Sequence, residues 1–252
     1  MNVFSFIFSP TGGTKKAADI VASCFLGDHQ SIDLTRPVDF MMTLTETDIA
    51  ILAVPSFGGR VPAVALERLR QIKAERTRAV LLVSFGNRAI DDAMIELYDE
   101  AVKIGFLPFA GIAAVTEHSI FREYGKNRPD ESDKRQLTEF ALKINDALDF
   151  GCSGFSDLVP GNRPYKEFGG VPLKPKAGKA CTKCRTCAMS CPVNAIPLEN
   201  PQFTYAKRCI SCMRCISVCP EQARSLNSLL YKSARLMMNK ALCEHKDNKL
   251  YL

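Results

Sequence analysis

Short apolar runs alternate with longer amphipathic stretches through the first 150 residues of the chain. Between the runs, apolar side chains recur every three or four positions, as they do along one face of a helix. A run that is apolar at every position is typical of a strand buried on both faces of a parallel sheet. The alternation predicts an α/β fold with a doubly wound, five-stranded parallel sheet and right-handed crossovers. The runs expected to form its strands are 3–8, 32–34, 49–54, 79–83 and 108–115.

Three glycine-containing loops follow the first, third and fourth predicted strands. The carboxyl ends of parallel strands share one edge of the sheet, where ligands of such folds bind. In the first loop Ser9, Thr11 and Thr14 supply hydroxyls, and Gly12 and Gly13 let the backbone wrap closely around an anion. The loop leads into a predicted helix, whose first N–H groups favour negative charge. A phosphate site is the sharper interpretation, and an ordinary strand–helix turn is the alternative.

Nucleotide sites of other kinds find no support in the chain. The first loop contains no lysine, and the G-x-x-x-x-G-K-[ST] pattern of nucleoside triphosphate sites is absent. The G-x-G-x-x-G pattern of nicotinamide dinucleotide sites is absent as well. A phosphate bound by the first loop therefore belongs to a different kind of cofactor.

The second half of the chain contains a repeated cysteine pattern. Eight of the 11 cysteines lie between Cys181 and Cys219, in two copies of C-x2-C-x2-C-x3-C-P. This is the bacterial ferredoxin run, in which the fourth cysteine of each copy binds the other cluster. Zinc is the alternative, but zinc sites use separated C-x2-C pairs rather than triplets. The predicted ligands of two [4Fe–4S] clusters are Cys181, Cys184, Cys187 and Cys219 for one, and Cys209, Cys212, Cys215 and Cys191 for the other.

Composition and charge narrow the possible environments. The chain has 252 residues, 46% of them apolar, and no apolar run approaches the roughly 18 residues of a membrane-spanning helix. Its start lacks the basic region and cleavage site of a signal peptide, so we expect a cytoplasmic protein with reduced thiols. The formal net charge of +6 divides into −5 for residues 1–159 and +11 for residues 160–252. Because the basic half holds the predicted clusters, we attribute its charge to compensation for them rather than to nucleic acid.

The whole chain resembles the flavodoxin–ferredoxin fusion proteins of anaerobic prokaryotes. The resemblance rests on the phosphate loop, on loops 57–62 and 86–88, and on both cysteine runs, and it covers nearly the full length. It implies a flavodoxin-like FMN-binding domain over 1–150. Residues 151–180 are rich in Gly, Pro and Lys but contain aromatic anchors such as Phe168, so we expect an ordered linker there. The resemblance further implies a small α+β ferredoxin-like domain with two [4Fe–4S] clusters over 181–225, followed by a C-terminal helical extension over 226–252. The apolar residues of this segment suggest that it forms a helix packing on one of the two modules, and they are Leu226, Leu229, Leu230, Leu236 and Met237.

The resemblance also implies roles around the flavin. The first loop would bind the FMN phosphate, Phe57 and Phe85 would stack on or cover the ring, and Asn87 would bond its pyrimidine carbonyls. Core packing is the alternative for each phenylalanine. Two further residues, His118 and Arg88, are weaker candidates for the flavin site. The residues implied for FMN are Ser9, Thr11, Gly12, Gly13, Thr14, Ser56, Phe57, Gly58, Gly59, Ser84, Phe85, Gly86 and Asn87.

Two functions follow from the resemblance. The favoured one is a carrier that relays single electrons between two [4Fe–4S] clusters and a bound FMN in low-potential anaerobic redox metabolism. Its partners would be a donor protein and an acceptor protein, neither of which the sequence identifies. The sequence also leaves the oligomeric state open. The alternative is a reductase whose flavin passes a hydride to a small organic acceptor, with His118 or Arg88 positioning that acceptor. A regulatory cluster module lacks the helix-turn-helix that DNA binding would require.

Overall fold

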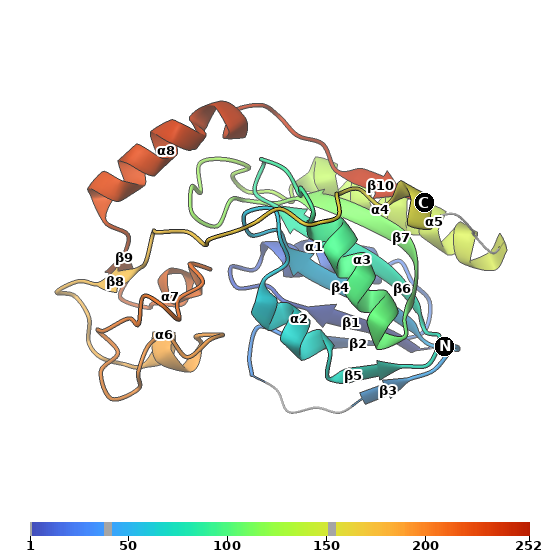
Figure 1. Cartoon of the computed structure of the whole chain (residues 1–252), viewed down its shortest axis with the longest axis horizontal. Coiled ribbons are helices and arrows are strands. Elements are labelled where there is room, and N and C mark those ends of the chain that lie inside the picture. Colours follow the sequence, from blue (N-terminus) through green and yellow to red (C-terminus); the bar gives the residue numbers. More distant parts are fainter. Residues whose placement is uncertain (1, 38–41, 151–154) are drawn as a thin grey trace.

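The computed structural model describes residues 2–37, 42–150 and 155–252. At its centre five parallel strands lie in the order β2-β1-β4-β6-β7 (Figure 1). This is the doubly wound flavodoxin-like order, with the switch point between β1 and β4. The predicted five-stranded parallel sheet is therefore confirmed. The strands are β1 (Asn2–Ile7), β2 (Asp28–Asp33), β4 (Ile49–Pro55), β6 (Arg78–Phe85) and β7 (Leu107–Val115).

Helices cover both faces of this sheet. On one face α1 (Gly13–Ala22) packs beside α4 (Glu131–Phe150), and on the other lie α2 (Ala63–Leu69) and α3 (Ala93–Ile104). Strand β4 shows why its sequence is apolar throughout. Ile49 and Ile51 belong to the core beneath α1 and α4, whereas the alternate residues Ala50 and Leu52 belong to the core beneath α2 and α3. Because successive side chains point to opposite faces, a strand covered on both sides has no polar position.

A sixth strand, which the sequence pattern does not predict, joins the sheet from the far end of the chain. Strand β10 (Lys249–Tyr251) pairs antiparallel with β7, with Leu250 opposite Ile112. Two short strands, β3 (Met42–Leu44) and β5 (Ile72–Ala74), form a separate parallel pair.

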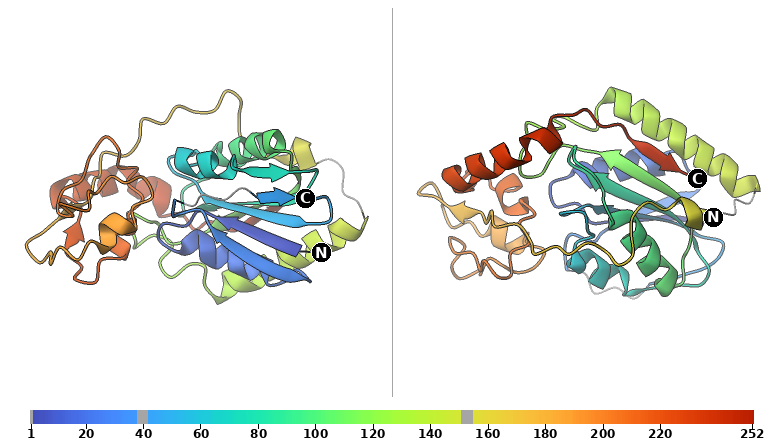
Figure 2. Two further views of the ribbon diagram at one scale, coloured as in Figure 1. Left: turned by 90° about the horizontal axis from the view of Figure 1, so that it is seen from below. Right: turned by 45° about the horizontal axis from the view of Figure 1, so that its top comes forward.

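Two short helices organise the cysteine-rich half. Helix α6 (Thr186–Met189) lies in the first cysteine run and α7 (Arg214–Ser217) in the second. Each follows a residue in left-handed conformation, Arg185 with φ 68° and Met213 with φ 62°. Strands β8 (Lys176–Ala177) and β9 (Arg224–Ser225) pair antiparallel, and α5 (Phe155–Leu158) precedes them. The cysteine-rich half lies beyond the sheet edge at which the parallel strands end (Figures 1 and 2).

Specific contacts join the two halves. Arg68 of α2 donates to the carbonyl of Leu34 within the sheet half and to that of Pro192 in the cysteine-rich half, both over 2.5 Å. The guanidinium of Arg214 in α7 donates to the carbonyl of Pro10 in the first loop over 3.3 Å. The cysteine-rich half is therefore bonded to the loops at the sheet edge.

Helix α8 (Ser228–Leu242) follows β9 and carries the chain back toward the sheet. It packs through Tyr231, Ala234, Met238 and Leu242, which contact Phe121 and Tyr124 of the loop after β7. Of the apolar residues expected to make this contact, Leu226 packs in the same cluster just before the helix begins. Leu229, Leu230 and Leu236 are instead 76%, 54% and 79% exposed, and Met237, 81% exposed, borders the cavity described below. The spacing of apolar residues therefore predicts the helix, but not the face through which most of it packs. Within the described residues no helix combines the length and the apolar character needed to cross a bilayer.

Asn248 offers a test of the returning C-terminal segment. Its buried side chain accepts from the N–H of Val115 over 2.7 Å and donates to Asp133 over 2.8 Å and Gln136 over 2.7 Å. We expect Asn248→Ala to lower the free energy of unfolding by about 1–3 kcal/mol, because buried polar groups lose their partner. Denaturant unfolding would measure this against the exposed control Asn200→Ala. Equal stability of the two variants would contradict the assigned role of Asn248.

Candidate functional site

The first loop is held rigidly between β1 and α1. The Ser9 N–H donates to the Thr35 hydroxyl over 2.7 Å, and the Ser9 hydroxyl accepts from the Lys15 N–H over 3.0 Å. The buried hydroxyls of Thr14 and Ser84 share a hydrogen bond of 2.8 Å, which joins the first and third loops. Gly12 has φ 94°, a conformation that favours glycine, immediately before α1. The loop therefore presents Thr11 and the start of α1 outward on a fixed frame.

A cavity of about 350 Å³ lies beside the second and third loops. Its size is within the range of small-molecule sites, about 300–1,000 Å³. From the sheet it is lined by Phe57, Phe85 and other predicted residues, and from the cysteine-rich half by Ile210 and Ser211. The predicted residues that line it are Ser56, Phe57, Gly58, Gly59, Phe85, Gly86, Arg88 and His118. The structure thus brings together loops that are distant in sequence.

Residues that follow β7 and its helix in the sequence complete the cavity wall. Their place in this wall was not predicted from the sequence. Phe168 lies so close to Gly58 that a Cβ at this glycine would come within 2.1 Å of the ring. Gly58 has φ 61°, so this position combines a left-handed backbone with a close approach. Met237 and Met238 of α8 line another part of the cavity. The aromatic residue in the segment before the cysteines was the one available signal.

The structure places Asn87 differently from the expectation. Its side-chain amide donates to the carbonyl of Leu242 over 2.6 Å and to that of Glu244 over 2.9 Å, and it does not line the cavity. Both amide hydrogens are used to hold the chain after α8. Asn87 is therefore a contact to the C-terminal segment rather than a donor directed at a flavin ring. Phe85, by contrast, is buried in the core and also lines the cavity.

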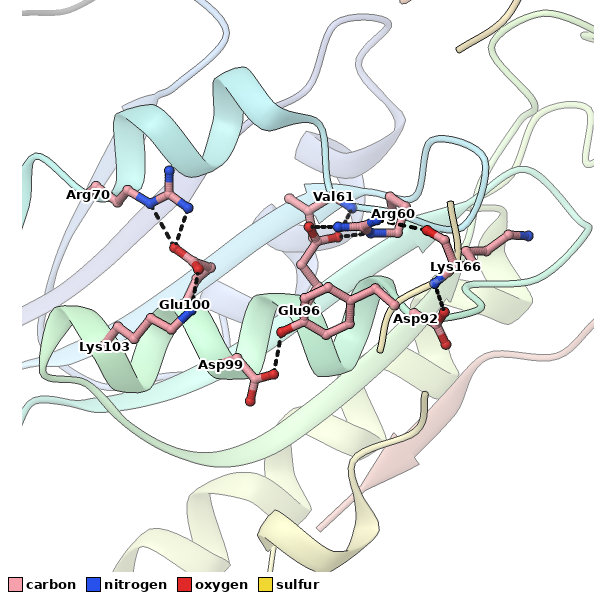
Figure 3. Close-up of polar contacts among 10 residues, drawn as sticks. Arg60, Val61, Arg70, Asp92, Glu96, Asp99, Glu100, Lys103 and Lys166 are labelled. Carbon is pink, nitrogen blue, oxygen red and sulfur yellow. Dashed lines mark hydrogen bonds and ion pairs between the residues drawn. The ribbon is translucent and has the colours of Figure 1, made fainter. Parts of the chain in front are cut away.

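The segment before the cysteine runs is fastened to α3 (Figure 3). Glu96 binds Arg60 through two hydrogen bonds of 2.8 and 2.7 Å and also accepts from the Val61 N–H over 2.8 Å. The guanidinium of Arg60 donates to the carbonyl of Lys166, whose N–H donates to Asp92 over 2.7 Å. One helix therefore fixes both the second loop and the segment that carries Phe168. The first four residues of the predicted linker, 151–154, lie outside the described residues.

Charges at the cavity rim are paired. Arg88 forms an ion pair with Asp91, and Lys166 binds the same carboxylate over 2.7 Å. Burial by itself would raise the pKa of Asp91, but the bonds to Lys166 and Arg88 outweigh it and lower that pKa. Asp91 is thus a carboxylate held between two cations. Arg88 lines the cavity with part of its charge already compensated.

His118 lies on the cavity wall as a neutral imidazole. Burial lowers its pKa to about 4. Its Nδ1 accepts from the backbone N–H groups of Ile120 and Phe121, both over 3.1 Å, so the proton of the neutral ring is on Nε2. A Cβ on Gly86 would lie 2.6 Å from the His118 Cα, so only glycine permits this approach. His118 is suited to donate a hydrogen bond at neutral pH but not to carry charge.

The cysteines gather into the two predicted groups. Cys181, Cys184, Cys187 and Cys219 line one small cavity. In the other group, Cys191, Cys209 and Cys215 are the thiols that act electrostatically on Cys212. Nowhere in the described part of the chain do three or more His, Cys, Asp or Glu side chains form a group that could hold a single metal ion. The sulfurs of the first group are instead spread around a cavity, to which two distant cysteine runs contribute.

Burial and hydrogen bonds give these thiols different properties. Burial raises the pKa of Cys212 to about 12 and that of Cys215 to about 11. The exposed Cys184 has a lowered pKa because it is hydrogen-bonded to Thr186. Backbone N–H groups point at two sulfurs in equivalent places, from Ala195 to Cys191 over 3.2 Å and from Ala223 to Cys219 over 3.3 Å. The repeat in sequence is therefore a repeat in hydrogen bonding.

These donors fit iron–sulfur clusters. Thiolates are the ligands such clusters use, and N–H···S bonds to them stabilise their negative charge. The buried thiols would give up their protons on binding iron, because the metal charge replaces the proton. Three features therefore agree with iron–sulfur binding, namely the two sulfur groups, the N–H donors to the sulfurs and the excess of basic residues in this half.

Comparisons with known proteins agree with this division of the chain. Residues 180–224 match the family model of the 4Fe-4S dicluster domain. No curated protein sequence matches the chain. Over the first half, the chain is similar in structure to flavodoxins. The chain therefore combines a sheet of flavodoxin-like strand order with a segment that matches a 4Fe-4S domain.

Three of these flavodoxins show the extent of the similarity. A flavodoxin from the Archaea is 12% identical, with a TM-score of 0.42, over 59% of this chain and 99% of its own. That of Streptococcus pneumoniae TIGR4 is 21% identical, with a TM-score of 0.40, over 58% and 99%. The Fusobacterium nucleatum flavodoxin bound to flavin mononucleotide is 16% identical, with a TM-score of 0.39, over 57% and 97%.

The lowered pKa of His118 predicts a pH-dependent stability. Between its ordinary pKa of 6.5 and about 4, the unfolded chain binds a proton that the folded histidine does not. The stability contributed by the neutral ring is complete above pH 6.5 and is lost as the pH falls toward 4. We expect His118→Gln to reduce this acid destabilisation. Urea unfolding at several pH values would test it, with the exposed His245→Gln as control, and an unchanged pH slope in His118→Gln would contradict it.

Proposed function

We propose that the protein is an electron carrier that holds FMN in its flavodoxin-like half and two [4Fe–4S] clusters in its cysteine-rich half. Single electrons would pass between these centres within one chain. The observation that carries the proposal is the composition of the 350 Å³ cavity wall. Phe57 and His118 line it from the sheet, whereas Ile210 and Ser211 line it from the loop between the cluster ligands Cys209 and Cys212. A flavin in this cavity would lie directly beside a cluster loop.

The proposed FMN site uses the loops as the flavodoxin resemblance implies. Thr11 and the start of α1 would bind the phosphate, and the cavity beside the second and third loops would hold the ring. His118 would direct its Nε2 proton to an acceptor at the cavity wall. The Fusobacterium nucleatum flavodoxin is bound to the same cofactor. FMN supplies the ability to exchange electrons either singly or in pairs.

The proposed cluster ligands follow the two cysteine groups. One cluster would use Cys181, Cys184, Cys187 and Cys219, and the other Cys209, Cys212, Cys215 and Cys191. The second cluster would be the one next to the flavin, because its loop contributes to the cavity. The first includes the exposed Cys184, which suits exchange with a redox partner protein. The electron path would therefore run between partner, outer cluster, inner cluster and FMN, in a reducing compartment such as the cytoplasm.

Apolar side chains around the cavity favour the carrier over the small-molecule reductase. A reductase needs room for a substrate over the flavin face. Phe168 from the linker and Met238 from α8 line that space together with Ile210. The segment with Phe168 is fastened to α3, so the apolar wall is part of the fold.

The crossed pairing of cysteines predicts the iron content of double variants. Cys181→Ser with Cys219→Ser removes two ligands of one cluster, so we expect about four iron atoms per chain to remain, the content of a single [4Fe–4S] cluster. Cys181→Ser with Cys191→Ser removes one ligand from each cluster, so we expect both to be lost. Iron and sulfide analysis of anaerobically purified protein measures the outcome. The reverse pattern would show that each run binds its own cluster.

Rapid mixing tests the relay itself. The anaerobic holoprotein should contain one FMN, and a one-electron reductant should bleach the clusters before it reduces the flavin. Cys209→Ser with Cys191→Ser should slow flavin reduction, because the inner cluster is missing. Cys24→Ser, which changes a thiol outside both groups, serves as the matched control. Flavin reduction at an unchanged rate without the inner cluster would exclude internal transfer.

A further inference from the structure

The two cysteine runs differ at one buried position. In each run the crossing cysteine is followed by a proline and, after two more residues, by an alanine whose N–H donates to the sulfur of that cysteine. The next residue is Ile196 in the first run and Arg224 in the second. Both are almost fully buried, at 4% and 3% exposure. An apolar side chain in one half of the repeat thus corresponds to a guanidinium in the other.

The contacts of Arg224 place it between the two cysteine groups. Its guanidinium lies 3.6 Å from the Cys187 sulfur and donates to the Pro201 carbonyl over 2.7 Å and to the Thr204 hydroxyl. Its positive charge also acts electrostatically on the thiol of Cys215. Cys187 and Cys215 belong to different proposed clusters. One cation therefore reaches a ligand of each.

The charge of Arg224 has no protein counterion in the described residues. None of the ion pairs found there includes it, and its Nε is buried without a hydrogen-bond partner. Burying an unpaired charge is costly unless another charge compensates it. Each cluster with its four thiolates carries roughly two negative charges. The two clusters are the counterions that this position lacks.

We propose that Arg224 is a shared electrostatic partner of both iron–sulfur clusters, which raises both reduction potentials together. The inference rests on the proposed presence of two clusters and goes beyond it by assigning the residue that adjusts them. Reduction adds an electron to a cluster, so a fixed positive charge and an N–H···S bond favour the reduced state. Because one guanidinium serves both clusters, its removal affects both potentials in the same direction.

The test is a redox titration of anaerobic holoprotein, followed by EPR. Arg224→Ile reproduces the residue of the first run, and Arg224→Gln keeps a donor but removes the charge. We expect both variants to shift both potentials to more negative values by at least a tenfold change in the reduction equilibrium, about 59 mV for one electron. Arg224→Lys keeps the charge and should shift them less. Arg208→Gln, which removes an exposed charge from the same half, should leave them unchanged because solvent screens it.

Iron content distinguishes the possible failures. Unchanged potentials in variants with eight irons would overturn the proposal, and so would a shift in only one cluster. If Arg224→Ile loses iron, the comparison of Arg224→Lys with Arg224→Gln still separates charge from packing. Loss of iron in all three would show a structural residue and also overturn the proposal. Fewer than eight irons in the unchanged protein would instead contradict the proposed two-cluster function.

Discussion

The parallel direction of the sheet is the constraint on which the rest of the structure depends. Parallel strands deliver all their following loops to a single edge, and the chain must return behind the sheet each time. The Ser9, Phe57 and Phe85 loops therefore meet although they are far apart in sequence. The cysteine-rich half lies at this same edge, where Arg214 donates to the Pro10 carbonyl and Arg68 to the Pro192 carbonyl. The candidate sites are close to one another because one edge holds them all.

Ion pairs are a second feature of this edge of the sheet. Glu96 is matched by Arg60, and Asp91 by Arg88 and Lys166. These pairs order the loop and linker around the cavity. Arg224 differs from these residues, because it forms no ion pair in the described part of the chain and its guanidinium lies 3.6 Å from the Cys187 sulfur. The excess of basic residues over 160–252 thus includes at least one cation placed at the thiols themselves.

Local patterns predicted the parts of this molecule that local physics determines. The run 49–54 is apolar because both faces of β4 are covered, and cysteine spacing reflects how a short loop surrounds a cluster. The parts that sequence reasoning missed depend on distant partners. Strand β10 has three residues, too few for a period, and Asn87 is held by carbonyls of Leu242 and Glu244 near the other end of the chain. Likewise, the contact of Phe168 with Gly58 arises only when the linker lies on α3.

Strand β10 attaches the cysteine-rich half to the sheet at a second point. Along the sequence the cysteine-rich half follows the sheet, but the chain leaves the sheet after β7 and returns to its edge at β10. The half between them is therefore attached at two points, as an insertion would be, and cannot swing about a single tether. In the proposed relay, electrons would pass between the halves at a separation set by the fold. The rate of this transfer should be independent of dilution and of solvent viscosity, unlike that of two carriers that must meet by diffusion.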